Sequence, residues 1–111
     1  MFVSDCLGVN EKGHLTIGGA DTVEIAAQYG TPVIVYDENA IRRNCRAFVG
    51  SIGEYYGGNG RVLYANKAFS CLEMCRIAQE EDMGLDVVSG GEIYTALKAG
   101  FPAEKTVFSR Q

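Results

Sequence analysis

Residues 84–92 read Gly-Leu-Asp-Val-Val-Ser-Gly-Gly-Glu, an apolar segment that runs directly into a helix start. The apolar run 85–88 predicts a short strand. Ser89 is suited to cap the helix that follows, because its hydroxyl can accept from a free N–H group of the first turn. Gly100 is a natural end for that helix. The stretch therefore predicts one β/α unit.

The alternation of strand and helix continues on both sides of this unit. Residues 61–66 predict a strand, and the sequence Ser-Cys-Leu-Glu at 70–73 has the pattern of a capping box at a helix start. A further strand is expected near Thr106. Cys71 and Cys75 lie four residues apart on one face of the predicted helix, where they favour reduced, buried thiols rather than a disulfide or a metal site.

Upstream, the β-branched run 31–36 predicts another strand, which ends at the N-cap residue Asp37. Apolar residues at helical spacing between 41 and 52 predict an amphipathic helix, and the Gly-rich segment 57–60 ends it. A shorter helix is expected from Asp21 to Gly30.

Strands that alternate with helices imply right-handed crossovers and a parallel sheet. A closed barrel of this kind takes eight strands and roughly 250 residues, whereas this chain has 111 residues. We therefore expect an α/β fold that contains the first few parallel β/α units of a partial (β/α)8 TIM-type barrel. On this interpretation residues 1–111 form one incomplete barrel domain, cut short at Gln111.

Composition excludes several classes of protein. With 47% hydrophobic and 22% charged residues, the chain is typical of a globular protein rather than a disordered one. The net charge of −4 and the absence of a basic run argue against nucleic acid and anionic membranes as partners. The N-terminus lacks the pattern of a secretory signal, which predicts a cytoplasmic protein.

Ligands of parallel α/β proteins gather at the carboxyl ends of the strands. Lys67 follows one predicted strand end and Asp86 lies in the next strand. A lysine there can form a Schiff base with an aldehyde, or it can simply extend into solvent. Asp86 can equally be structural, and Ser89-Gly90-Gly91 can either approach a phosphate or only cap a helix. His14, the one histidine, is expected to be solvated.

Two motifs carry a resemblance to a known family. Residues 64–70, Tyr-Ala-Asn-Lys-Ala-Phe-Ser, resemble the Schiff-base lysine motif of barrel-type pyridoxal-phosphate decarboxylases. Residues 84–92 are similar to that family's second signature, and residues 94–102 continue a pattern typical of its diaminopimelate decarboxylase branch. Phe69 stands where many members have Asn. The resemblance covers about His14 to Phe108.

The resemblance implies a carboxy-lyase with pyridoxal 5'-phosphate as cofactor. Lys67 would bind the cofactor, and Asp86 would lie near the cofactor and Lys67. Ala65 would pack beside the cofactor ring. Glu92 is a weaker candidate for supporting the active site. The implied reaction converts meso-diaminopimelate to L-lysine and carbon dioxide, the last step of lysine biosynthesis, in a full-length homodimer. No metal is implied.

The resemblance also places several parts of the enzyme outside this chain, among them the C-terminal β-domain and the groups for ring nitrogen, phosphate and substrate. We therefore expect the 111-residue chain alone to be inactive. Two alternatives remain open: a related decarboxylase of the ornithine or arginine type, or a non-catalytic fragment whose open sheet edges pair with other copies.

Overall fold

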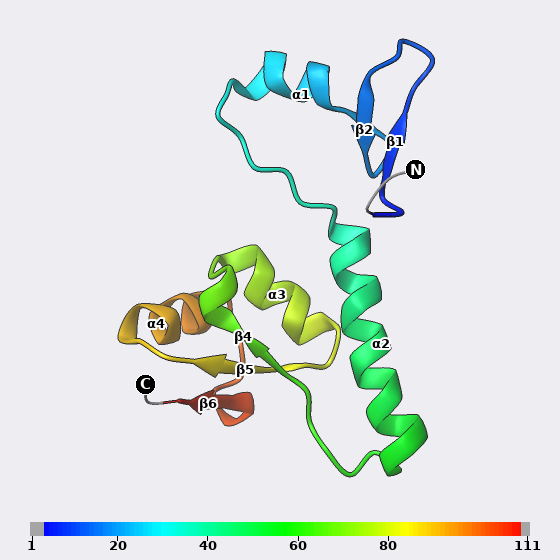
Figure 1. Ribbon diagram of the computed structural model, residues 1–111. Helices are drawn as coiled ribbons and strands as arrows, with labels where there is room; N and C mark the ends of the chain where they lie inside the picture. Colours follow the sequence, from blue (N-terminus) through cyan, green and yellow to red (C-terminus); the bar gives the residue numbers. More distant parts are fainter. Residues whose placement is uncertain (1–3, 110–111) are drawn as a thin grey trace. The chain divides into compact units, whose positions relative to one another are not determined.

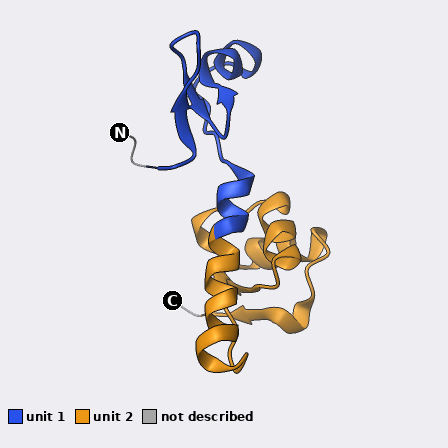
Figure 2. Cartoon of the chain, turned by 90° about the vertical axis from the view of Figure 1, so that its right-hand side faces the viewer, with its two compact units in different colours: residues 1–43 blue, residues 44–111 orange. Residues whose placement is uncertain are grey.

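A computed structural model of the protein describes residues 4–109. The chain divides into two compact units, and the boundary between them falls within the long helix α2 (Glu38–Tyr56). Figure 2 shows the first unit, residues 1–43, in blue and the second, residues 44–111, in orange. None of the described helices combines the length and apolar character that a bilayer crossing requires.

The first unit pairs a small antiparallel sheet with one helix. Its strands β1 (Leu7–Val9), β2 (Leu15–Ile17) and β3 (Ala20–Asp21) pair in sequence order, and α1 (Thr22–Tyr29) follows. The predicted helix is confirmed. The three strands were not predicted, because strands of two or three residues are too short to show an alternating pattern.

Asp21 joins the sheet to the helix of the first unit. Its Oδ1 accepts from the backbone N–H groups of Val23 at 2.8 Å and Glu24 at 3.2 Å, which caps α1. Its Oδ2 pairs with Nδ1 of His14 at 2.8 Å and accepts from Nδ2 of Asn10 at 2.9 Å. His14 is thus partly exposed to solvent, as expected, but its ring is also held by a hydrogen bond to Asp21 that the sequence did not predict. The His14 hydrogen bond is the main cause that holds the pKa of Asp21 well below its usual range.

This network predicts how the first unit responds to acid. A carboxyl whose folded pKa is lowered stabilises the fold above its unfolded pKa of about 4, and this stability is lost as the pH falls through the folded value. The first unit should therefore loosen below about pH 4, and Asp21→Asn should remove most of this pH dependence while lowering stability at pH 7. The ring proton signals of His14 report the transition by NMR. Glu11→Gln, an exposed carboxylate of the same unit, is the control. An unchanged acid transition in Asp21→Asn would contradict the assignment.

The second unit contains a three-stranded parallel sheet in the order β4-β5-β6, as the alternation of strand and helix predicted. After α2, its elements follow one another as β4 (Leu63–Ala65), the 3-10 turn η1 (Asn66–Ala68), α3 (Leu72–Glu80), β5 (Gly84–Val87), α4 (Gly90–Lys98), the 3-10 turn η2 (Ala103–Lys105) and β6 (Thr106–Phe108).

Helices α3 and α4 lie on one face of this sheet (Figure 1). Leu85 and Val87 of the central strand have no exposed surface, and α3 contributes the equally buried Cys75. The opposite face carries Ala65, Asp86 and Val107 in register across the three strands. The core of the unit therefore lies between β5 and the two helices, and the other face of the sheet remains open.

Gly84 is required by the close approach of the neighbouring strands. A Cβ atom at this position would lie 2.7 Å from the backbone oxygen of Lys105 and 2.5 Å from a methyl carbon of Leu63. The side chain of Leu63 can move, but the backbone cannot do so without disturbing the sheet.

Gly84→Ala should therefore destabilise the second unit by about 1–3 kcal/mol, the usual cost of overpacking. Urea unfolding followed by far-UV circular dichroism measures the change. Gly53→Ala is the matched control, because a Cβ at that helical position meets nothing within 4 Å. Equal unfolding midpoints for the two variants would show that the sheet adjusts freely.

The strand predicted at 31–36 is wrong. This segment has no regular secondary structure, and the side chain of Ile34 is 81% exposed. A strand needs a neighbour that completes its backbone hydrogen bonds, and neither of the two described sheets includes these residues. The predicted cap is confirmed, because Asp37 Oδ1 accepts from the N–H groups of Asn39 at 2.9 Å and Ala40 at 3.3 Å.

The cysteines partly follow the prediction. All four are free thiols, but only Cys45 and Cys75 are buried, whereas Cys6 and Cys71 are partly exposed. Burial is the main cause that raises the pKa of the Cys75 thiol, which therefore stays protonated.

Candidate active site

Lys67 lies just past the carboxyl end of β4, within the turn η1. Its side chain is exposed, and it forms no ion pair with any of the residues 4–109. The other three lysines each have a partner: Lys12 pairs with Glu24 at 3.2 Å, Lys105 pairs with Asp82 at 3.5 Å, and the ammonium of Lys98 lies 5.7 Å from the ring centre of Tyr94.

Ala65 and Asp86 are direct neighbours across the sheet. The register of β4 and β5 pairs their Cα positions, so both lie on the open face at the sheet edge that Lys67 follows. Asp86 Oδ1 is buried and has no hydrogen-bond partner among the described residues. A buried carboxylate oxygen without a hydrogen-bond donor is costly. This indicates that a bound ligand supplies the donor.

Glu92 lies in the first turn of α4, close to the carboxyl end of β5. Ser89 caps the helix as predicted, since its Oγ accepts from the Glu92 N–H at 3.2 Å and donates to Glu92 Oε2 at 3.1 Å. The other carboxylate oxygen, Oε1, is buried without a hydrogen-bond partner among the described residues, and Glu92 as a whole is 8% exposed. The helix cap thus explains the hydrogen bonds of Ser89, but it provides no partner for Oε1 of Glu92.

Two residues that hold the lysine turn were not predicted. The Tyr64 hydroxyl donates to the Phe69 carbonyl at 3.2 Å. Nδ2 of Asn66 donates to Ser70 Oγ at 3.1 Å. The polar Asn directly before Lys67 and four residues before a Ser was the signal available in the sequence.

Helix α3 starts one residue later than predicted. Ser70 Oγ accepts from Asn66 and does not cap the helix. Cys71 takes that place, and its Sγ accepts from the Met74 N–H at 3.4 Å.

These residues fit a cofactor that carries an aldehyde and positive or N–H groups. Within residues 4–109, Lys67 offers an exposed amine without an ion pair, and Asp86 offers a buried oxygen without a donor. Ala65, exposed beside Asp86 on the open face, has a side chain small enough to leave room for a ring. The donor set therefore suits pyridoxal phosphate.

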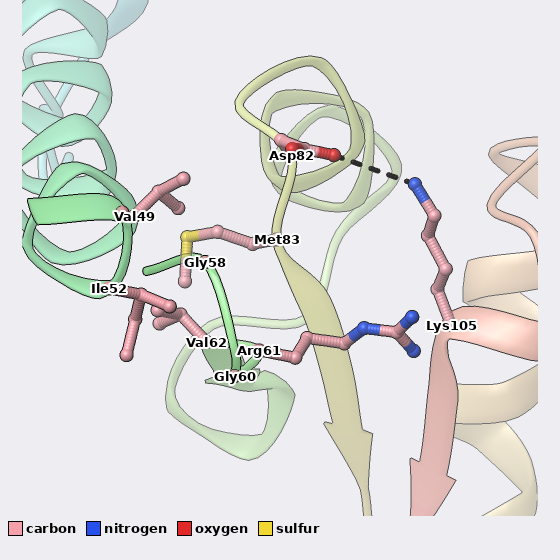
Figure 3. Close-up of a pocket in the computed structure, with 10 residues that line it drawn as sticks. Val49, Ile52, Gly58, Gly60, Arg61, Val62, Asp82, Met83 and Lys105 are labelled. Atoms are coloured by element: carbon pink, nitrogen blue, oxygen red, sulfur yellow. Dashed lines mark ion pairs between the residues drawn. The ribbon is translucent and has the colours of Figure 1, made fainter. Parts of the chain in front are cut away.

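A separate hollow of about 350 Å³ lies at the other end of the same sheet (Figure 3). Val62, Met83 and Lys105, which line it, each stand immediately before a strand, so it lies at the amino ends. Asp82 and Lys105 form an ion pair at its rim. Because ligands of parallel α/β folds bind at the carboxyl ends, this hollow does not belong to the site around Lys67.

The sequence profile of the pyridoxal-dependent decarboxylase family, pyridoxal binding domain, matches residues 38–111. The chain therefore belongs to the pyridoxal-dependent decarboxylases. Pyridoxal phosphate, the cofactor expected from the sequence, is the cofactor of this family.

Within the family, the chain is similar to proteins named diaminopimelate decarboxylase. The one from Bacillus methanolicus is 53% identical over 108 residues, which cover 97% of this chain and 25% of that protein. The one from Bacillus subtilis (strain 168) is 47% identical, with 97% and 24% covered. The crystal structure of diaminopimelate decarboxylase from M. jannaschii in co-complex with L-lysine has a TM-score of 0.80 and 34% identity, and covers 97% of this chain and 25% of that one.

The chain thus spans about a quarter of the length of the curated relatives it matches. The resemblance found in the two motifs of the sequence is confirmed over nearly the whole chain.

Proposed function

We propose that this chain supplies the cofactor-binding lysine and its surroundings in a diaminopimelate decarboxylase, which converts meso-diaminopimelate to L-lysine and carbon dioxide. The observation that carries the proposal is the placement of Lys67. It is an exposed amine with no ion pair among the described residues, directly after the carboxyl end of a parallel strand and close to the register pair Ala65 and Asp86.

Each residue of the site has a role that follows from its position. Lys67 Nζ holds the cofactor covalently, which requires an accessible amine at the strand end. When bound, pyridoxal phosphate supplies an electron sink for the charge left by the departing carboxylate. Asp86 presents a carboxylate oxygen that orients the amine or the cofactor and stabilises positive charge there. Ala65 leaves room beside the ring.

The fold and assembly form part of the same proposal. Three parallel strands with two helices on one face are consistent with the first units of a (β/α)8 barrel, in which the open face of the sheet points inward. On this proposal the chain is the N-terminal part of a barrel domain in a cytoplasmic homodimer. The identities of 47–53% with the Bacillus proteins support the substrate over ornithine or arginine.

The test grafts residues 4–109 into the Bacillus methanolicus relative in place of its matching segment. The hybrid is supplied with pyridoxal phosphate and, in parallel, with meso-diaminopimelate, L-ornithine and L-arginine, and carbon dioxide release is followed. Turnover of meso-diaminopimelate alone is expected. A folded hybrid that carries the cofactor on Lys67 but prefers ornithine or arginine would contradict the substrate, and a cofactor on another lysine would contradict the site.

Asp86→Asn in the same hybrid should lower turnover by roughly 10–100-fold, because the charge beside the cofactor is lost. Its stability should hardly change, since Asp86 Oδ1 has no hydrogen bond to any described residue and a neutral amide is less costly to bury than a carboxylate. Urea unfolding and carbon dioxide release are measured on the same samples. Turnover equal to that of the unaltered hybrid would contradict a role of Asp86 at the cofactor.

A further inference from the structure

Asn66 is the one polar side chain in residues 4–109 with no exposed surface. It precedes Lys67 in the turn η1, and its side chain reaches the buried Cys75 of α3. A fully buried amide is costly unless both its donor and its acceptor are satisfied. Its place next to an exposed lysine therefore needs a physical reason.

Both ends of the Asn66 amide are bonded. The thiol of Cys75 in α3 donates to Asn66 Oδ1 at 3.8 Å, and Asn66 Nδ2 donates to Ser70 Oγ at 3.1 Å. The thiol can act as a donor because burial raises the pKa of Cys75 and keeps it protonated. The amide of Asn66 thus connects the turn to helix α3 through Cys75 and to Ser70, which follows the turn.

Because Asn66 and Lys67 are neighbours in the turn, holding one side chain in place restricts the orientation of the other. A 3-10 helix has three residues per turn, so neighbouring side chains leave its axis about 120° apart. If Asn66 is held facing the core, Lys67 must leave the turn in a fixed direction. The Tyr64 hydroxyl, bonded to the Phe69 carbonyl, limits the remaining freedom of the loop.

We infer that Asn66 is a positioning residue for Lys67: its amide, held between Cys75 and Ser70, fixes the turn so that the lysine amine is presented at the sheet edge. This inference rests on the proposed role of Lys67. It extends that role to a residue that touches neither cofactor nor substrate and acts through the backbone of the turn.

The experiment measures where pyridoxal phosphate reacts on the 111-residue chain. The chain is exposed briefly to limiting pyridoxal phosphate and quenched with borohydride, which fixes the cofactor on the reacting amine. Peptide mapping by mass spectrometry then gives the ratio of adduct on Lys67 to adduct on Lys98. Lys98 is the internal reference, because it lies in α4, outside the turn.

Four variants separate positioning from folding. Asn66→Leu removes the amide, and Ser70→Ala removes its acceptor at an exposed position, where loss of the fold is not expected. Ser70→Thr keeps the hydroxyl and should rescue the ratio. Ser51→Ala is the matched control, since its exposed hydroxyl bonds only within α2, to the Ala47 carbonyl. Far-UV circular dichroism establishes that each variant is folded.

We expect Ser70→Ala, and Asn66→Leu if it folds, to lower the ratio by about 5- to 30-fold, the range that corresponds to the conformational freedom regained by one backbone residue. Ser70→Thr and Ser51→Ala should keep the unaltered value. A folded Ser70→Ala with an unchanged ratio would overturn the inference and leave the role of Lys67 intact. No preference for Lys67 over Lys98 in the unaltered chain would also overturn this inference, whereas the proposed function fails if the hybrid carries the cofactor on another lysine.

Discussion

Lys67→Ala is expected to abolish both the covalent attachment of pyridoxal phosphate at this site and the decarboxylation that depends on it. In the Bacillus methanolicus hybrid, carbon dioxide release from meso-diaminopimelate should fall by more than about a hundredfold, since even a small misplacement of a catalytic group costs that much. Borohydride reduction followed by peptide mapping locates the adduct, and carbon dioxide release gives the rate.

Lys105→Ala is the control for this experiment. It removes an ammonium from the same unit, but at the amino end of a strand and paired with Asp82. Its effect on turnover should be small. The assignment of Lys67 fails if the adduct is found on Lys12, Lys98 or Lys105 in the unaltered protein, or if Lys67→Ala retains ordinary turnover.

Leu85→Ala is expected to unfold most of the second unit at moderate urea concentrations. Leu85 has no exposed surface and lies in the central strand of the sheet, which α3 packs against. Removing a buried leucine side chain costs about 2–5 kcal/mol, a large share of the 5–15 kcal/mol that typically stabilises a domain. Far-UV circular dichroism during urea titration measures the loss.

Leu72→Ala provides the comparison, because the same atoms are removed from a side chain that is 46% exposed at the start of α3. Its unfolding midpoint should move much less. If the two variants unfold at the same urea concentration, the core does not lie between β5 and its helices.

The parallel sheet of the second unit could be predicted because its signals are local. Ser89 caps the helix that its hydroxyl predicted, and the apolar run after Met83 forms the buried strand β5. The segment 31–36 has an equally good strand composition but forms no strand. Composition describes one chain segment, whereas a strand also requires a partner.

The part of the candidate site that could be predicted is the part fixed by the ends of the parallel strands. Lys67 and Asp86 lie at the expected edge because parallel strands end on the same side. The unpaired oxygen of Asp86 and the buried amide of Asn66 depend on how α3 and the turn pack together. No spacing rule contains that information.

The two sheets differ in how far apart along the chain their paired residues lie. In the first unit Leu7 pairs with Ile17, a local hairpin that can form within microseconds. In the second, Leu63 pairs with Gly84 and Leu85 with Thr106, so each pairing must first close a loop of about twenty residues. Such pairings form more slowly. We therefore expect the lysine turn, which depends on contacts between η1 and α3, to acquire its shape later in folding than the hairpin of the first unit.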